Sequence, residues 1–358
     1  MNKYLIKELM NVNRGSSPRP IIEYLSDSGY RWLKISDFNM YDRYVYETKE
    51  FIKESGLKNT RHLPAGTLIL TNSATPGIPI FLGRDMCLHD GFLYFTNIKE
   101  DIININFLYY WLLYNKNLIV NQANGSVFKN LKKDIVENFE INVPNMDTQL
   151  KIVEVLDNIN SKIELNNEIN NNLYELIKNN YEALISNFDW EEVELGTIAN
   201  ITSGKRPVDK LETGAYPVIG ANGIMAYTND FNFNEDLIIT GRVGTLGVVR
   251  RYAEQIWASD NTLVIQTKYL NYIENYMKTI DYYSLNRGST QPLLTQGDLK
   301  KQIIMFNEEA VLRFEEENQI FIDKIKNNEK ENKNLEQLRD TLLPKLMNGE
   351  IDLDNIEI

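Results

Sequence analysis

The chain has 358 residues, enough for two or more domains of roughly 150 residues each, and 43% of them are hydrophobic, which excludes a disordered or fibrous protein. A single cysteine excludes a disulfide framework and a cysteine-based zinc site, and the net charge of −12, taken as an average, argues against a nucleic-acid-binding protein. The first apolar run breaks at Lys7 and Glu8, and no apolar stretch reaches 18 residues. We therefore expect neither a signal peptide nor a membrane span, but a cytoplasmic protein.

Two segments, 1–146 and 188–307, mix short apolar runs with Gly, Pro and Asn, a pattern typical of strands joined by turns. In the first segment we predict a strand over 67–71 and a helix around 105–119. In the second we predict strands over 237–240 and 261–266 and a helix around 270–283. Each segment therefore combines strands with one helix.

A long stretch almost free of Gly and Pro follows each of these segments, and it predicts helices over 147–185 and 308–347. Apolar residues and asparagines recur there with alternating spacings of four and three, the period of a coiled coil. We therefore predict that the two helices pack on each other, with asparagines fixing their register. The alternative is that each helix packs on its own domain with the asparagines facing water. The seam residues are Ile159, Ile163, Asn166, Asn170, Leu173, Phe321, Ile325, Asn328, Asn332 and Leu335.

The second half of the chain repeats the first. SKIELNNEINNNLYEL (161–176) aligns without gaps with DKIKNNEKENKNLEQL (323–338). Three further pairs match in the same order, namely 6–15 with 195–204, 68–77 with 237–247, and 124–131 with 287–294. Shared composition explains one such match but not an ordered series, so we predict two copies of one unit.

The excess negative charge is concentrated in the predicted helices. Residues 1–145 hold 17 basic and 15 acidic side chains, and 190–307 hold 11 and 13. Residues 146–189 hold 3 and 8, and 308–358 hold 7 and 14. Because screening limits charge attraction to about 8 Å at physiological salt, near-neutral domains can bind DNA through local basic clusters. The acidic helices are either solvated faces or a surface for a partner protein.

Basic and amide side chains gather near glycine-rich turns at corresponding places in the two copies. Such turns let the backbone approach phosphates, and Arg, Asn and Gln can read base edges. Taken singly, each residue reads as an ordinary surface charge, and only the recurrence suggests DNA contact. The DNA-binding candidates are Arg14, Ser16, Arg19, Asn72, Arg84, Lys129, Lys132, Lys205, Arg206, Arg242, Arg250, Arg251, Arg287 and Gln291.

Sequence motifs of catalysis are absent. There is no Gly-x-Gly-x-x-Gly loop, Gly204-Lys205 lacks the rest of a Walker loop, and no Asn-Pro-Pro-aromatic methyltransferase motif occurs. A string from Asp42 to Lys49 imitates a nuclease motif only loosely and has no counterpart in the second copy. Two histidines, 27 residues apart, and one cysteine leave no paired-histidine metal site and few nucleophile–base pairs. We therefore expect a binding protein with no catalytic residue, metal or cofactor of its own.

These features together resemble the DNA-specificity (S) subunit of type I restriction–modification systems. The resemblance is carried by the repeated K-I-x-x-N-x-x-x-N-x-x-L-x-x-L pattern, by LRDTLLPKLMNGEIDL (338–353) and by the Leu-x-x-Ile-x-x-x-x-Ser-Gly start at 195–204. The first copy departs from that start, since it has Arg14-Gly15 where the second has Ser203-Gly204. The resemblance covers essentially the whole chain.

The resemblance implies an α+β fold with a pseudo-twofold internal repeat. Two similar target-recognition domains, 1–146 and 188–307, would be separated by a central helix (147–187) and a C-terminal helix with its tail (308–358). In this family the helices form an antiparallel coiled coil, which docks two modification subunits. Recognition domains that differ in sequence would read the two unlike halves of a bipartite site in double-stranded DNA.

The resemblance also implies that catalysis belongs to partner subunits. S-adenosylmethionine would be used by the modification subunits, and ATP and magnesium by restriction subunits if these are present. The paired helices would act as a ruler, since 39 residues span about 58 Å, or roughly 17 base pairs. Half-sites on one face of DNA most naturally lie about 10 base pairs apart. Two alternatives stay open: a coiled-coil scaffold that ignores DNA, and a self-sufficient DNA methyltransferase or nuclease.

Overall fold

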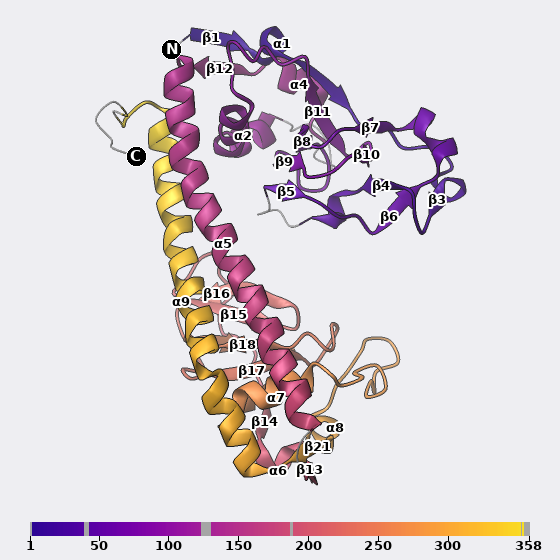
Figure 1. Ribbon diagram of the computed structural model, residues 1–358, viewed down its shortest axis with the longest axis vertical. Coiled ribbons are helices and arrows are strands. Elements are labelled where there is room, and N and C mark those ends of the chain that lie inside the picture. The colour runs from indigo at the N-terminus through magenta and orange to yellow at the C-terminus, as the bar shows by residue number, and fades with distance from the viewer. Residues whose placement is uncertain (1, 39–42, 123–129, 187–188, 352, 354–358) are drawn as a thin grey trace. The chain divides into compact units, whose positions relative to one another are not determined.

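The computed structural model describes residues 2–38, 43–122, 130–186, 189–351 and 353 (Figure 1). The chain divides into two compact units, residues 1–164 with 332–358, and residues 165–331. Each unit combines a globular part of strands and short helices with a segment of both long helices. These are α5 (Met146–Ile185) and α9 (Glu308–Met347), at the positions that the sequence predicts. The mixed composition confirms the α+β prediction.

The globular part of the first unit is built from two five-stranded sheets and a two-stranded ribbon. The sheets have the orders β3-β6-β4-β10-β7 and β2-β11-β8-β9-β5, and β1 pairs with β12 in the ribbon. Both β8 and β9 are buried along their whole length, which explains their unbroken apolar runs. The strands are β1 (Asn2–Leu5), β2 (Asn11–Arg14), β3 (Leu25–Ser26), β4 (Tyr30–Leu33), β5 (Tyr44–Val45), β6 (Glu50–Ile52), β7 (Arg61–Leu63), β8 (Leu68–Thr71), β9 (Pro79–Leu82), β10 (Met86–Leu88), β11 (Phe92–Thr96) and β12 (Glu140–Val143).

The helix predicted around 105–119 is divided in two. The Asn104 side chain caps the start of the first helix by accepting hydrogen bonds from two backbone amides. That helix ends at Asn115, whose Nδ2 donates to the Trp111 carbonyl 2.9 Å away and so competes with the helical hydrogen bonds. The helices of this part are α1 (Ile6–Leu9), α2 (Ile105–Tyr114), α3 (Lys116–Gln122) and α4 (Lys133–Glu137).

The globular part of the second unit contains a four-stranded sheet, a three-stranded sheet and a ribbon. Their orders are β14-β20-β17-β18, β16-β15-β19 and β13-β21. The strands are β13 (Glu191–Glu194), β14 (Asn200–Ser203), β15 (Tyr216–Gly220), β16 (Gly223–Thr228), β17 (Leu237–Gly241), β18 (Arg250–Tyr252), β19 (Trp257–Ala258), β20 (Thr262–Gln266) and β21 (Ile303–Phe306), and the helices are α6 (Leu195–Ile198), α7 (Leu270–Met277) and α8 (Gln296–Lys300).

The internal repeat is confirmed element by element. The ribbon β1-β12 corresponds to β13-β21, and the strand order β2-β11-β8-β9 corresponds to β14-β20-β17-β18. The second large sheet of each unit contains a parallel strand pair, β4 with β10 and β15 with β19. The helices α1, α2 and α4 have counterparts in α6, α7 and α8 at the same places in the order. The first unit adds strands to both of its sheets, so the shared elements define a common scaffold.

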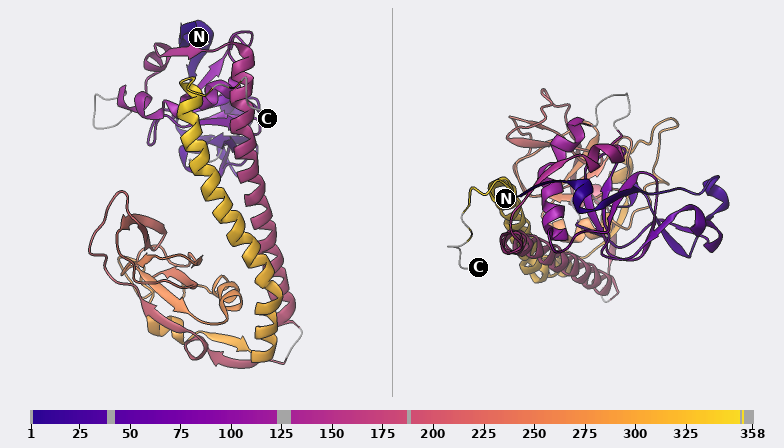
Figure 2. Two further views of the ribbon diagram at one scale, coloured as in Figure 1. Left: turned by 90° about the vertical axis from the view of Figure 1, so that its left-hand side faces the viewer. Right: turned by 90° about the horizontal axis from the view of Figure 1, so that it is seen from above.

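The long helices pair antiparallel in each unit, and Figure 1 and Figure 2 show their segments side by side. In the second unit Asn328 Nδ2 donates to Asn170 Oδ1 at 2.7 Å, and Asn180 donates to Asn318. In the first unit Arg339 Nη1 contacts Asn160 Oδ1 at 3.4 Å. Every residue of the seam named above is buried or half-buried. The helices also pack on the globular parts, but the seam asparagines are buried, so the alternative in which they face water is wrong.

An ion pair fastens each globular part to a long helix. In the first unit the Arg43 side chain is 9% exposed, and its Nη1 lies 2.5 Å from Asp157 Oδ1 on α5. The Arg43 guanidinium also lies 5.2 Å from the centre of the Tyr109 ring. In the second unit Asp236 accepts from Arg251 at 2.7 Å and from Lys326 of α9 at 2.6 Å. In each unit one of these ion pairs, Arg43–Asp157 or Lys326–Asp236, connects a loop of the globular part to a long helix of the same unit.

Candidate nucleic-acid interface

The turn after the first sheet strand is built in the same way in both units. In the first unit Gly15 N donates to Phe92 O and Ser16 N donates to Leu88 O. In the second, Gly204 N donates to Thr262 O and Lys205 N to Ala258 O. Both units therefore close this turn onto the loop between two later strands.

Glycine is required in both turns because a neighbouring backbone lies too close for a side chain. A Cβ on Gly15 would lie 2.1 Å from the carbonyl oxygen of His89. A Cβ on Gly204 would lie 2.2 Å from the carbonyl oxygen of Ser259. The backbone that carries the basic candidates beside these glycines is therefore held in place by close packing.

Asp90 is the residue on which the candidates of the first unit converge. Its backbone carbonyl accepts from Arg14 Nε at 2.9 Å and from Asn72 Nδ2 at 3.2 Å. Its carboxylate accepts from Ser17 Oγ at 2.9 Å and lies 3.5 Å from Arg19 Nη2. Ser16, in contrast, donates to the Asn59 carbonyl. The structure thus brings Arg14, Arg19 and Asn72 together around one loop.

The electrostatics of this cluster keep Asp90 ionised and His89 neutral. Burial opposes ionisation of Asp90, but the Ser17 hydrogen bond, the interaction with His89 and the charges of Arg14 and Arg19 together lower its pKa. Burial lowers the pKa of His89, an effect that Asp90 opposes and nearby basic residues reinforce. Gly91 N donates to His89 Nδ1 at 2.9 Å, which leaves Nε2 to donate to Asp90 Oδ1 at 3.1 Å. The carboxylate therefore holds the arginines in place without neutralisation by a proton.

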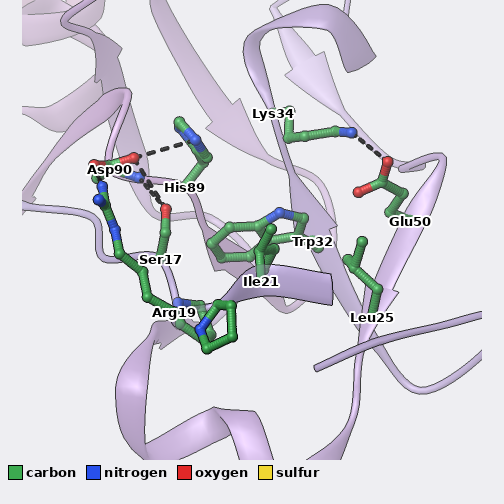
Figure 3. Close-up of a pocket in the computed structure, with 11 residues that line it drawn as sticks. Ser17, Arg19, Ile21, Leu25, Trp32, Lys34, Glu50, His89 and Asp90 are labelled. Carbon is green, nitrogen blue, oxygen red and sulfur yellow. Dashed lines mark hydrogen bonds and ion pairs between the residues drawn. The ribbon is translucent and has the colours of Figure 1, made fainter. Parts of the chain in front are cut away.

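A cavity of about 680 Å³ lies beside this cluster (Figure 3). Ser17, Arg19, His89 and Asp90 line one side, and the close-up shows Trp32 between them and the ion pair of Lys34 with Glu50. Arg19 is thus at the edge of a hollow on the surface that carries the basic candidates.

The second unit places its candidates around the equivalent loop, 259–261. Arg242 N donates to Asn261 O, and Arg242 Nη1 donates to Asp260 O at 3.2 Å. The loop 287–294 lies against the same place, because Leu294 N donates to Arg242 O and Gly244 N donates to Pro292 O. Lys205, Arg206, Arg242 and Gln291 therefore come from three segments that meet here.

Arg287 lies in this loop and is paired with an acidic side chain. Its Nη2 lies 2.8 Å from Asp298 Oδ1 on α8. Hydrogen bonds from Arg287 and Thr295 lower the pKa of Asp298 to about 2. The carboxylate is therefore charged at any pH near neutrality, and Arg287 is oriented by it.

Asn72 and Arg242 occupy equivalent positions with different side chains. Asn72 N donates to Gly91 O as Arg242 N donates to Asn261 O, and Leu131 N donates to Asn72 O as Leu294 N donates to Arg242 O. Asn72 is 3% exposed, and its Oδ1 has no hydrogen-bond partner among the described residues. Asn72 is thus buried and connects the loops at Gly91 and Leu131, whereas Arg242 is half-buried.

Arg250 and Arg251 face different surroundings on β18. The Arg251 side chain is 13% exposed and is held by Asp236 and by Asn271 Oδ1 at 2.6 Å. Arg250 is exposed, and both arginines line a separate cavity of about 370 Å³ with Tyr174 of α5. The Arg251 guanidinium therefore binds Asp236 and Asn271 within the fold, which the sequence did not indicate.

The remaining candidates lie apart from these clusters. Arg84 follows β9 and lies 3.6 Å from Glu47, an exposed ion pair of little energetic weight. Lys132 is exposed just before α4. Lys129 lies outside the described residues. No contact in the structure connects Arg84 or Lys132, among the described residues, with the loop around Asp90.

Sequence reasoning missed Asp90 and Asp260, on which these clusters are built. The signal that could have found them is the repeat itself, since Leu88-His-Asp-Gly-Phe-Leu93 aligns with Ala258-Ser-Asp-Asn-Thr-Leu263. In both units this Asp is followed by Gly or Asn in the turn into the next strand, β11 or β20.

Within the part of the chain that the structure describes, no group of three or more His, Cys, Asp or Glu side chains is placed to hold a metal ion. Nor does any helix there have the length and apolarity that crossing a membrane requires.

Comparison with known proteins gives a consistent set of relatives. The family model described as the type I restriction modification DNA specificity domain matches residues 1–175 and 187–339. The type I restriction enzyme MjaIX specificity subunit of Methanocaldococcus jannaschii is 26% identical over 412 residues, covering 98% of this chain and 93% of the relative. The type I restriction enzyme EcoprrI specificity subunit of Escherichia coli is 24% identical, covering 83% and 81%.

A solved structure shares the fold. The crystal structure of the type I restriction–modification system S subunit from M. genitalium matches with a TM-score of 0.53 and 19% sequence identity. The match covers 96% of this chain and 95% of that chain. At this level of identity the likeness concerns the fold alone.

Proposed function

The chain belongs to the type I restriction–modification DNA specificity family as a specificity subunit, and on this premise we propose that it reads a bipartite, asymmetric DNA site. The globular parts at 1–146 and 188–307 are the two target-recognition domains, and each reads one half-site. The segments 147–187 and 308–358 set the spacer between the half-sites and dock two modification subunits. Catalysis then lies in partner subunits.

The observation that carries this proposal is one scaffold built twice with different exposed side chains. Gly15 and Gly204 make the same backbone contact, and the loops at Asp90 and Asp260 receive it. Arg14 and Ser16 on one scaffold correspond to Ser203 and Lys205 on the other. Two like folds with unlike contact residues suit two half-sites of unlike sequence.

Every candidate except Asn72 and Arg251 is assigned to DNA. Phosphate neutralisation requires side chains that reach solvent, and base edges are read by Arg, Asn and Gln in the grooves. The buried Asn72 and Arg251 are assigned instead to holding the loop and the strand in place. The DNA-contacting set is Arg14, Ser16, Arg19, Lys205, Arg206, Arg242, Arg250, Arg287 and Gln291, with Arg84, Lys129 and Lys132 as peripheral phosphate contacts.

The long helices suit a protein partner better than DNA. Their segments carry most of the net negative charge, which repels phosphate. In the first unit Leu150 and Leu338 are 49% and 47% exposed, and in the second unit Ile320 is 70% exposed. Exposed apolar side chains on an acidic helical surface are consistent with docking of another protein. We assign this surface to the modification subunits.

Partner subunits would supply the cofactors of the complex. S-adenosylmethionine would be bound by the modification subunits, and ATP and magnesium by restriction subunits where they assemble. Because the target is chromosomal and invading DNA, we place the complex in the cytoplasm.

The test is to sequence the modified adenines of a host that expresses this chain with its modification subunit. The expected result is one motif of two unlike half-sites separated by a fixed, unread spacer. A continuous motif, or no modified motif, would refute the proposal. Specific cleavage or methylation by the purified chain alone would favour the enzyme alternative. Failure to shift DNA at low salt would favour the scaffold.

A further inference from the structure

The turn after β2 and the turn after β14 align without a gap as Gly-x-x-Pro followed by one more residue. Gly15 and Gly204 occupy the first position, and Pro18 and Pro207 the fourth. Both prolines are buried. Because a buried proline has a fixed φ and is packed in place, the backbone of the next residue leaves it in a defined direction.

The residue after the buried proline projects from the turn in both units. The Arg19 side chain is 82% exposed in the first unit, and Val208 is 86% exposed in the second. These two residues are equivalent in the fold but opposite in chemistry. They are also attached, through the glycine contacts, to the loops at Asp90 and Asp260 that collect the other DNA candidates.

We propose that Arg19 and Val208 are specificity-determining residues that enter the major groove, Arg19 reading a guanine in one half-site and Val208 the methyl group of a thymine in the other. The inference rests on the proposed function, since it names which side chains distinguish the half-sites.

Arg19 has the geometry for base reading because its guanidinium is oriented but only weakly held. Its one ion pair described above, with Asp90 at 3.5 Å, joins an exposed guanidinium to a carboxylate that is 29% exposed, and at this distance it is easily exchanged for a base. Asp90 stays ionised because Ser17 and the nearby positive charges oppose the effect of its burial. A guanidinium presents two parallel donors, which match O6 and N7 of guanine in the major groove.

Val208 is an apolar side chain that is 86% exposed at the tip of the turn, where another surface can cover it. It follows Lys205 and Arg206, both exposed, so phosphate attraction brings DNA to this tip. A β-branched side chain is stiff at χ1 and offers a fixed apolar surface. Among the base edges in the major groove, only thymine presents a methyl group for such a contact.

The experiment uses the full chain in complex with its modification subunit and duplexes that carry the mapped site. Each guanine is replaced in turn by 7-deazaguanine, which lacks the N7 acceptor, and each thymine by uracil, which lacks the methyl group. For the wild type we expect one guanine in the first half-site whose replacement weakens binding about fivefold or more. We expect one thymine in the second half-site whose replacement weakens binding about fourfold.

The variants assign these effects to the two side chains. Arg19→Ala should become insensitive to the 7-deazaguanine and keep its response to uracil, and Val208→Ser should do the reverse. Lys3→Ala and Ile303→Ser are matched controls, because Lys3 is 69% exposed on β1 and Ile303 is 52% exposed on β21, outside the DNA-contacting set and the long helices. Both controls should respond as the wild type does.

The outcomes separate this inference from the function on which it rests. If the wild type binds a bipartite site but Arg19→Ala and Val208→Ser keep both sensitivities, the tip residues do not read these bases and only this inference fails. If no replacement in either half-site changes wild-type binding, it fails equally. If the complex binds no specific site, the proposed function fails with it.

Discussion

Replacing Gly204 by alanine tests whether the turn that carries the second recognition cluster is fixed by backbone contact. The added Cβ would lie 2.2 Å from Ser259 O and 2.5 Å from Ala258 O, far inside an ordinary contact of about 3.5 Å. Both atoms are backbone, so the turn must move by more than about 1 Å. That movement disrupts the hydrogen bonds from Gly204 N to Thr262 O and from Lys205 N to Ala258 O, at 3.1 and 2.9 Å.

The magnitude follows from these contacts. Overpacking costs about 1–3 kcal/mol, and each of the two hydrogen bonds adds about 0.5–1.5 kcal/mol, so we expect Gly204→Ala to destabilise the second unit by about 2–6 kcal/mol. Displacement of Lys205 and Arg206 should also weaken binding to the second half-site. The assays are denaturant unfolding and DNA titration of the complex.

Gly297 provides the matched control within the same unit. A Cβ there meets only Thr295 Oγ1, at 3.8 Å, and the residue is in α8. Gly297→Ala should leave stability unchanged or raise it by up to about 1 kcal/mol, since alanine favours helix. If Gly204→Ala is as stable as this control and binds DNA as the wild type does, the steric argument is wrong.

Three further predictions concern contacts within each unit. Arg43→Ala leaves Asp157 without its buried partner and should lower the unfolding free energy by about 3–5 kcal/mol in denaturant titration, whereas an unchanged midpoint would contradict the anchoring role. Burial raises the pKa of Glu315 to about 7, above its unfolded value near 4.5. The protonated carboxyl therefore contributes about 3 kcal/mol of stability, which is fully present below pH 4.5 and is lost as the pH rises through 7. The difference in unfolding free energy between pH 5 and pH 8 should therefore shrink in Glu315→Gln, and an equal difference would refute this assignment. Replacing both Asn170 and Asn328 by leucine should raise the melting temperature, because the buried amide pair lowers stability. The variant should also form other helix registers or oligomers, and light scattering would detect the oligomers. A strictly monomeric, less stable variant would contradict the role of this pair in fixing the register.

The large elements could be predicted from the sequence because their patterns are long and local. The period of 3.5 over 147–185 and 308–347 identified α5 and α9 almost to the residue. The ordered matches between the halves identified the repeat, including the equivalence of Gly15 with Gly204. The division of the helix around 105–119 at Asn115 was missed, because a single side-chain hydrogen bond ends α2 there.

The candidate site was predictable only in part, because charge and exposure are independent in a sequence. Arg250 and Arg251 are adjacent and identical in type, yet one is exposed and the other is held by Asp236 and Asn271. The alternation of strand β18 separates them, and short strands give a weak signal for which face is buried. Asp90 was missed because its role depends on partners 73 and 76 residues away in the chain, Ser17 and Arg14.

The proposed setting of the DNA spacer by the paired helices is the central claim. Its most direct test is to remove one heptad from each helix, 163–169 and 329–335, which retains the Asn170–Asn328 pair and the Asn160–Arg339 contact. Seven residues rise about 10.5 Å, or roughly three base pairs. Sequencing of modified adenines should then show the same two half-sites with a spacer about three base pairs shorter, modified less efficiently because their helical phase has changed. Modification at the original spacer would contradict the account.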